Sequence, residues 1–155
     1  MSGSYIVIMN LFKSKALDIS NLISMREKYY THEFYREIFL KKEKIADYID
    51  DSENFAVTII HAFNNNIQNP EYDIEVMYKM NGSAVPEDVQ KVDRLYLKDS
   101  VCVELIDEPE KMQKGVQALN DLALKMRLAI GRNVWVQHYR DKHLYIYLYA
   151  EKRDD

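Results

Sequence analysis

The clearest pattern along the chain is an alternation of apolar and polar side chains from Tyr72 to Met80. Tyr, Ile, Val and Met alternate there with Asp73, Glu75 and Lys79, which predicts a half-buried strand whose charged residues face water. The segment Phe55 to Phe63 is apolar on both alternating sets, which is typical of a central strand. His61 falls inside that strand, so we expect a core histidine with a hydrogen-bond partner.

Three segments have helical spacing. Residues 18–30 place Ile19, Leu22, Ile23 and Met25 on one side, and a second helix is predicted from Thr31 to about Ile49. The third is the longest: Asp107 can cap it, and apolar residues recur at spacings of three and four until Gly131, the predicted stop. Its apolar stripe is wider than one sheet face needs, so a second surface or a partner should cover it.

The C-terminal part predicts a β-hairpin of residues 133–139 and 143–150. A three-residue loop, Arg140-Asp141-Lys142, would place the aliphatic side chains of both strands on one face and the aromatic ones on the other. A two-residue loop would mix the two sets. We predict the three-residue loop, because Asp-Lys is a weak signal for the shorter turn.

These segments predict an α+β fold. We expect an antiparallel sheet of about five to six strands with helices packed mainly on one face, and the long helix followed by the C-terminal hairpin. A short strand is expected at Tyr5 to Met9, and a further hairpin from segments 94–97 and 101–106. We predict a single domain, 1–155, with flexible residues 1–4 and 151–155.

Charge and composition narrow the possible chemistry. The net charge of −4 is uneven: residues 1–50 carry +1, residues 51–110 carry −9 and residues 111–155 carry +4, which disfavours nucleic-acid binding by the whole surface. Only 4 glycines are present, too few for a phosphate-cradling loop. The single cysteine, Cys102, lies between two valines and is expected to be a buried small hydrophobe. We therefore expect no cofactor and no metal.

The candidate site is the aromatic face of the hairpin. Tyrosine and tryptophan combine an apolar body with a polar tip and dominate binding hot spots. The predicted interaction surface is Trp135, Tyr139, Tyr145, Tyr147 and Tyr149, and its possible polar or basic contacts are Arg132, His138, Arg140 and His143. Such a face can form a second core layer, a homodimeric or heteromeric interface, or a platform on which nucleic-acid bases stack.

The leading hypothesis is a small non-enzymatic protein-binding domain of adaptor, inhibitor or chaperone type that acts as a homodimer in the cytoplasm. It rests on the absent glycine loops and catalytic motifs, the wide long helix and the aromatic hairpin. One alternative is a nucleic-acid-associated protein that uses the hairpin aromatics. Another is a small enzyme whose site is assembled from dispersed residues. No segment is long enough to predict a membrane span.

Overall fold

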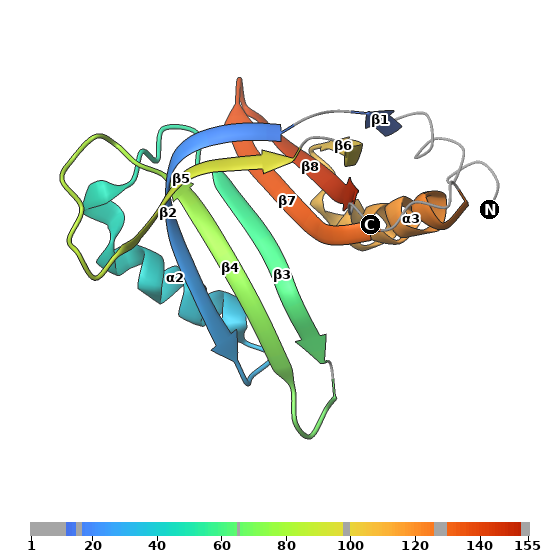
Figure 1. Ribbon diagram of the computed structural model, residues 1–155, viewed down its shortest axis with the longest axis horizontal. Coiled ribbons are helices and arrows are strands. Elements are labelled where there is room, and N and C mark those ends of the chain that lie inside the picture. The colour runs from blue at the N-terminus through green and yellow to red at the C-terminus, as the bar shows by residue number, and fades with distance from the viewer. Residues whose placement is uncertain (1–11, 15–16, 65, 98–99, 126–129, 153–155) are drawn as a thin grey trace.

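The computed structural model describes residues 12–14, 17–64, 66–97, 100–125 and 130–152. They form one antiparallel sheet of eight strands with two α-helices (Figure 1). The bounds are β1 Phe12–Ser14, β2 Leu17–Tyr29, α2 Phe34–Lys44, β3 Ala56–Asn64, β4 Glu71–Lys79, β5 Gln90–Leu97, β6 Ser100–Ile106, α3 Met112–Lys125, β7 Ile130–Arg140 and β8 His143–Lys152. Short 3-10 turns lie at Ala46–Tyr48 and Pro109–Lys111.

Two halves of the chain repeat the same arrangement. In the first half β2 is followed by α2, β3 and β4, and in the second β6 is followed by α3, β7 and β8. The strand order is β1-β6-β8-β7-β3-β4-β2-β5. The corresponding strands of the two halves therefore follow one another outward from the central β3–β7 pair in the same order, one half on each side. That pair includes Val57 opposite Val136 and Ile59 opposite Val134. The repeat lies in the topology, since the sequence contains no recognisable internal repeat.

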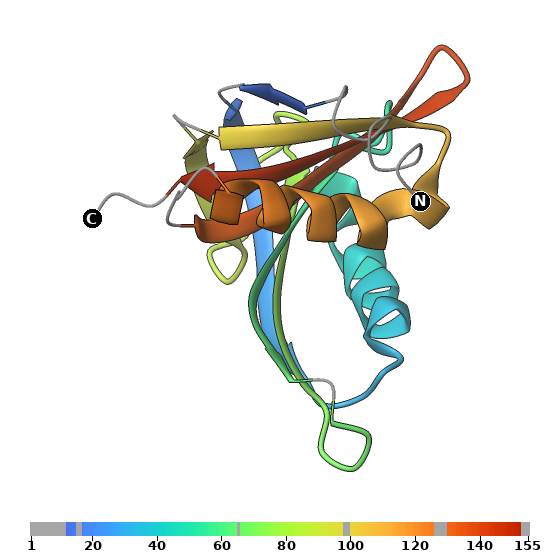
Figure 2. The same ribbon diagram turned by 90° about the vertical axis from the view of Figure 1, so that its right-hand side faces the viewer.

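Both helices lie on one face of the sheet (Figure 2). The helix α2 packs on a cluster that includes Ile23, Ile74 and Tyr78, and α3 packs on a cluster that includes Val103 and Leu148. The opposite face carries the third cluster, which contains side chains of β3, β4, β6, β7 and β8. Side chains of β5 and of the first part of β2 complete this third cluster, and both segments pass over the upper end of the sheet in Figure 1.

The predicted helix over residues 18–30 is wrong, because this segment is the strand β2. Its helical spacing arose from burial on both faces of a strand: Leu22, Ile23 and Ser24 are buried in succession. The strand pairs with β5 through residues 17–24 and with β4 through residues 22–29. Asn21, which interrupts the pairing with β5 between Ser20 and Leu22, has φ 60°, which asparagine tolerates better than most residues.

Other boundaries also need correction. The segments 94–97 and 101–106 are strands but do not pair with each other: β5 pairs with β2, and β6 pairs with β1 and β8. Gly131 lies in β7 rather than ending the long helix. The sheet has eight strands rather than five or six, mainly because β2 and β1 extend it. The strand predicted at residues 5–9 lies outside the described residues.

The C-terminal hairpin is present, but its loop has two residues. Arg140 pairs with His143, and Asp141 and Lys142 have φ of 52° and 69°. Positive φ at both central residues gives a turn whose twist matches that of the flanking strands, here without the usual glycine. The predicted three-residue loop is therefore wrong, and the aliphatic and aromatic sets are mixed.

The remaining strands and the second helix were predicted correctly. The strands β3 and β4 occupy the expected segments, and α2 lies inside the predicted helix 31–49. However, β4 is not the predicted half-buried strand: residues 74–78 are all buried, including Glu75, which was expected to face water and is 8% exposed. Within the described ranges, no helix is long and apolar enough to cross a membrane.

Candidate functional site

The two-residue turn divides the predicted aromatic surface between both faces of the sheet. Trp135 lies on the helix-covered face, packed against the cluster beneath α3. Tyr145, Tyr147 and Tyr149 lie on the opposite face, where Tyr149 is only 2% exposed and belongs to the third cluster. Burial raises the pKa of the Tyr149 hydroxyl well above its usual range. Tyr139 is half exposed at the end of β7.

Three of the four predicted polar contacts lie near the tip of the hairpin. The ring of His138 stacks on Tyr145 and Tyr147, at centroid distances of 5.3 and 5.9 Å. The Nδ1 of His143 lies 2.5 Å from Oδ2 of Asp107, and this contact lowers the pKa of the Asp107 carboxyl. Arg140 is exposed at the hairpin tip, and the side chain of Arg132 lies outside the described residues. The rings of His138 and His143 both contact the ring of Tyr145, and Arg140 pairs with His143 in the strand register.

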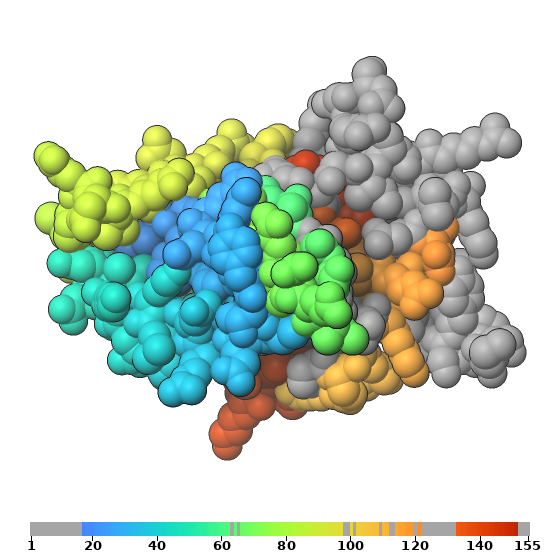
Figure 3. Space-filling view, turned by 90° about the horizontal axis from the view of Figure 1, so that it is seen from below, coloured from blue at the N-terminus to red at the C-terminus, as the bar shows by residue number. Residues whose placement is uncertain are grey.

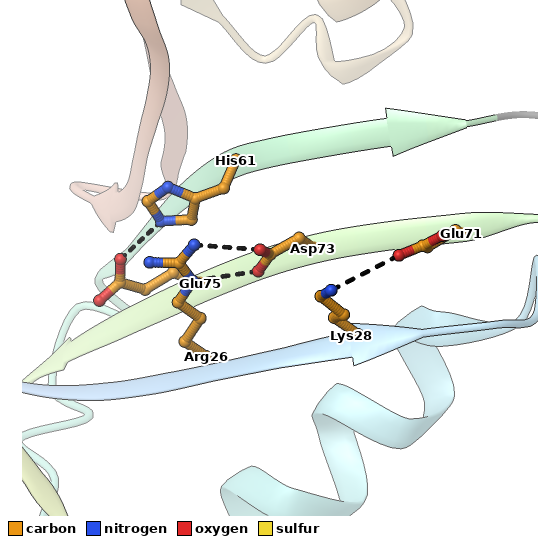
Figure 4. A network of polar contacts seen from close by, with 6 residues as sticks. All are labelled: Arg26, Lys28, His61, Glu71, Asp73 and Glu75. Carbon is orange, nitrogen blue, oxygen red and sulfur yellow. Dashed lines mark hydrogen bonds and ion pairs between the residues drawn. The ribbon is translucent and has the colours of Figure 1, made fainter.

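A polar network on the helix-free face is the first arrangement that sequence reasoning missed (Figure 4). Glu75 on β4 accepts a hydrogen bond from the Ser24 hydroxyl on β2, and its Oε1 lies 2.8 Å from Nε2 of His61 on β3. His61 sits at a β-bulge between Ile60 and Ala62, which aims its ring at β4. The predicted hydrogen-bond partner of His61 is confirmed, but its side chain is partly exposed, at 18%, and lies outside the core clusters.

Charged pairs extend the network along β2 and β4, toward the C-terminal end of β2 and the N-terminal end of β4. Arg26 binds Asp73 through two hydrogen bonds of 3.0 Å, and Lys28 lies 3.7 Å from Glu71. The Arg26 guanidinium holds the pKa of Asp73 below its usual range, mainly through these hydrogen bonds. No single segment of the sequence could indicate this set, because its members come from three strands and meet only through their register.

The order of groups in the network disfavours nucleophilic catalysis. A histidine that activates a serine must lie between the hydroxyl and the carboxylate. Here the Glu75 carboxylate lies between Ser24 and His61, so both residues interact with Glu75 and the His61 ring does not contact the Ser24 hydroxyl. Among the described residues, no group of three His, Cys, Asp or Glu side chains could hold a metal. The network therefore acts as an internal brace across β2, β3 and β4.

A second arrangement missed by the sequence surrounds α2. Four large apolar side chains lie exposed on this helix and on the turn before it, and we call them the α2 patch. They are Tyr30, Tyr35, Phe39 and Leu40, exposed at 66%, 65%, 60% and 53%. A groove of about 660 Å³ separates α2 from the end of β2, with Tyr30 and Leu40 among its lining residues. Figure 3 shows this side of the molecule, where α2 and the end of β2 lie next to each other.

The patch is exposed because α2 buries only one narrow side. Phe34 and Ile38 face the sheet, and the Phe34 ring lies 4.9 Å from that of Tyr72. No α2 residue is fully buried, and polar contacts hold its edges: Lys41 pairs with Glu27, and Lys42 lies 3.0 Å from Asp51. The sequence did contain a signal, since Tyr35, Phe39 and Leu40 lie off the predicted inward face.

Comparison with known proteins identifies no family. No protein-family description matches the chain, and no curated protein does. Among solved structures, it is similar to a "Putative bacterial transcription regulation protein" from Staphylococcus aureus MU50, with a TM-score of 0.44 and 11% identity. The similarity covers 92% of this chain and 99% of that one. At this TM-score the similarity supports no conclusion about function.

Proposed function

We propose that this chain is a non-enzymatic protein-binding domain and that the α2 patch is the surface that contacts the partner. The observation that carries the proposal is the clustering of Tyr30, Tyr35, Phe39 and Leu40, each more than half exposed, on one helix and its leading turn. Single exposed apolar residues are ordinary, but several large ones on one short segment, next to charged residues, are typical of interaction surfaces.

The chemistry of the patch also supports a protein partner. Aromatic side chains are enriched at protein interfaces, where an apolar ring with a polar tip tolerates both water and burial. The surroundings carry both signs of charge, including Glu37 and Lys44 beside the groove. A phosphate backbone would need clustered basic residues, so this mixed rim favours a protein over a nucleic acid.

Site-specific photo-crosslinking in the native host tests the proposal. We expect a photoreactive amino acid at position 35 to give a discrete covalent adduct, whose composition mass spectrometry then identifies. The matched control is position 117 on α3, where Gln117 is equally helical and exposed. No adduct from position 35, or the same adducts from both positions, would contradict an interface at the α2 patch.

A further inference from the structure

The outer side of α2 carries an ordered stripe of four exposed side chains. Arg36, Phe39, Leu40 and Glu43 follow one another at spacings of three, one and three, which places them along one side of a helix. The two apolar residues are in the middle, with a cation toward the N-terminus and an anion toward the C-terminus. Among the described residues, neither Arg36 nor Glu43 forms an ion pair within the chain.

This stripe is complementary to itself in the antiparallel direction. Consider a two-fold axis perpendicular to α2 that passes midway between Phe39 and Leu40. Arg36 and Glu43 are equally far from that axis, so Arg36 lies opposite Glu43 of the second copy, and Glu43 lies opposite its Arg36. Phe39 then meets Leu40 of the second copy at the centre. A two-fold interface uses one patch on both subunits, which requires this kind of self-complementarity.

We propose that the partner of the α2 patch is a second copy of this chain, bound through antiparallel pairing of the two α2 helices. The inference rests on the proposed function, whose surface it uses. The helix macrodipoles also run in opposite directions, which favours antiparallel neighbours.

The helix α3 shows why the charge pattern alone is not enough to predict self-pairing. Lys114 and Asp121 on α3 have the same separation as Arg36 and Glu43, and both are exposed. However, the positions between them are the exposed, polar Gln117 and the buried Ala118. Pairing of α3 with itself would therefore bury almost no apolar surface. Only α2 combines the charge pattern with an apolar centre, so only α2 should dimerise.

Charge reversal provides the test, with sedimentation equilibrium of the purified full chain as the measurement. A contact confined largely to one short helix buries less than the roughly 1,200 Å² of stable complexes, so we expect dissociation at micromolar or higher concentration. In a homodimer of either single variant, Arg36→Glu or Glu43→Arg, positions 36 and 43 carry the same charge. Both contacts between position 36 and position 43 of the second copy are then repulsive. Each variant should weaken dimerisation roughly tenfold or more, since exposed pairs contribute about 0.2–1 kcal/mol each.

Mixing the two variants gives the decisive outcome. A heterodimer of Arg36→Glu with Glu43→Arg restores two opposite-charge contacts, so the mixture should dimerise more tightly than either variant alone. The double variant in one chain should dimerise like the unchanged chain. The matched controls, Lys114→Glu and Asp121→Arg on α3, change net charge equally and should leave dimerisation unchanged.

Two outcomes would overturn the inference, and they separate it from the proposed function. A dimer unaffected by charge reversal on α2, or affected equally by reversal on α3, would place the contact elsewhere. A monomer at all concentrations would exclude self-association. If the crosslink at position 35 still joined a different protein, the α2 patch would remain a protein-binding surface with another partner. If that crosslink were absent as well, the proposed function would fail with it.

Discussion

The two halves of the molecule use one topology for different purposes. In the second half, α3 lies close to the sheet: Leu119 is 0% exposed, and a Cβ on Gly115 would lie 2.7 Å from Cδ1 of Leu148. In the first half, no α2 residue is fully buried, and its outer side carries aromatic and aliphatic residues. The difference shows that the repeated unit needs only one closely packed helix. The other helix keeps apolar residues that the core does not require.

The largest expected effect of a substitution is therefore in α3. Leu119→Ala removes a fully buried side chain and leaves a cavity, so we expect a loss of about 2–5 kcal/mol in the free energy of unfolding. Ile38→Ala, at a partly buried position of α2, should cost less than about 2 kcal/mol. Urea denaturation of both variants measures the difference. Equal losses would show that α2 is as essential to the core as α3.

The helix-free face gives the next largest contrast. Glu75 in the first half and Tyr147 in the second both lie on this face, on the strands next to the central pair: Ile59 pairs with Glu75, and Val136 pairs with Tyr147. One half thus buries a carboxylate where the other has a partly exposed phenol. A buried acid depends on its hydrogen-bond partners, so His61 should contribute more to stability than the Tyr147 hydroxyl.

Substituting His61 tests that contrast. His61→Ala leaves Glu75 with Ser24 as its remaining partner in the network, and we expect a loss of about 1–3 kcal/mol in the free energy of unfolding. Tyr147→Phe should cost less than about 1 kcal/mol. Adding Glu75→Met to His61→Ala should recover part of the loss, because no buried acid then remains. Failure to recover would assign the loss to the packing of the His61 ring.

Some elements could be located from their own sequence pattern, whereas β2 could not. Patterns within β3, β4 and α2 were sufficient to locate these three elements. The pattern of β2 was misleading, since Leu22 and Ile23 are buried on opposite faces and imitate a helical spacing. Ser24 gains its role from Glu75, which is 51 positions away, so only the strand register brings the two together.

The site was harder to predict than the fold. The hairpin aromatics were identified as a group, but a turn without glycine shifted their register by one residue and turned Trp135 to the other face. The exposed positions of α2 followed from the helical spacing, yet nothing in the sequence indicated that no second layer covers them. Whether an apolar side chain is covered depends on neighbours that are remote in the chain.

The smallest expected effect concerns the turns that join the last two strands of each half. In the second half, β7 and β8 meet at Asp141 and Lys142, both with positive φ, whereas the connection from β3 to β4 is longer. A left-handed conformation costs a non-glycine residue about 1–2 kcal/mol, and glycine avoids this cost. Glycine also gives the unfolded chain more conformational freedom, which offsets part of the gain in stability. Lys142→Gly should therefore raise the free energy of unfolding by about 0.5 kcal/mol.

A matched glycine in the other connection makes this small gain interpretable. Gln68 lies between β3 and β4 and is not among the described residues with positive φ. Gln68→Gly should therefore be neutral or slightly destabilising, because it adds flexibility without relieving strain. Thermal unfolding of the two variants side by side measures the difference. If both Lys142→Gly and Gln68→Gly stabilised the protein, the gain at Lys142 could not be assigned to its left-handed backbone. The two-residue turn would then hold no strain for glycine to release.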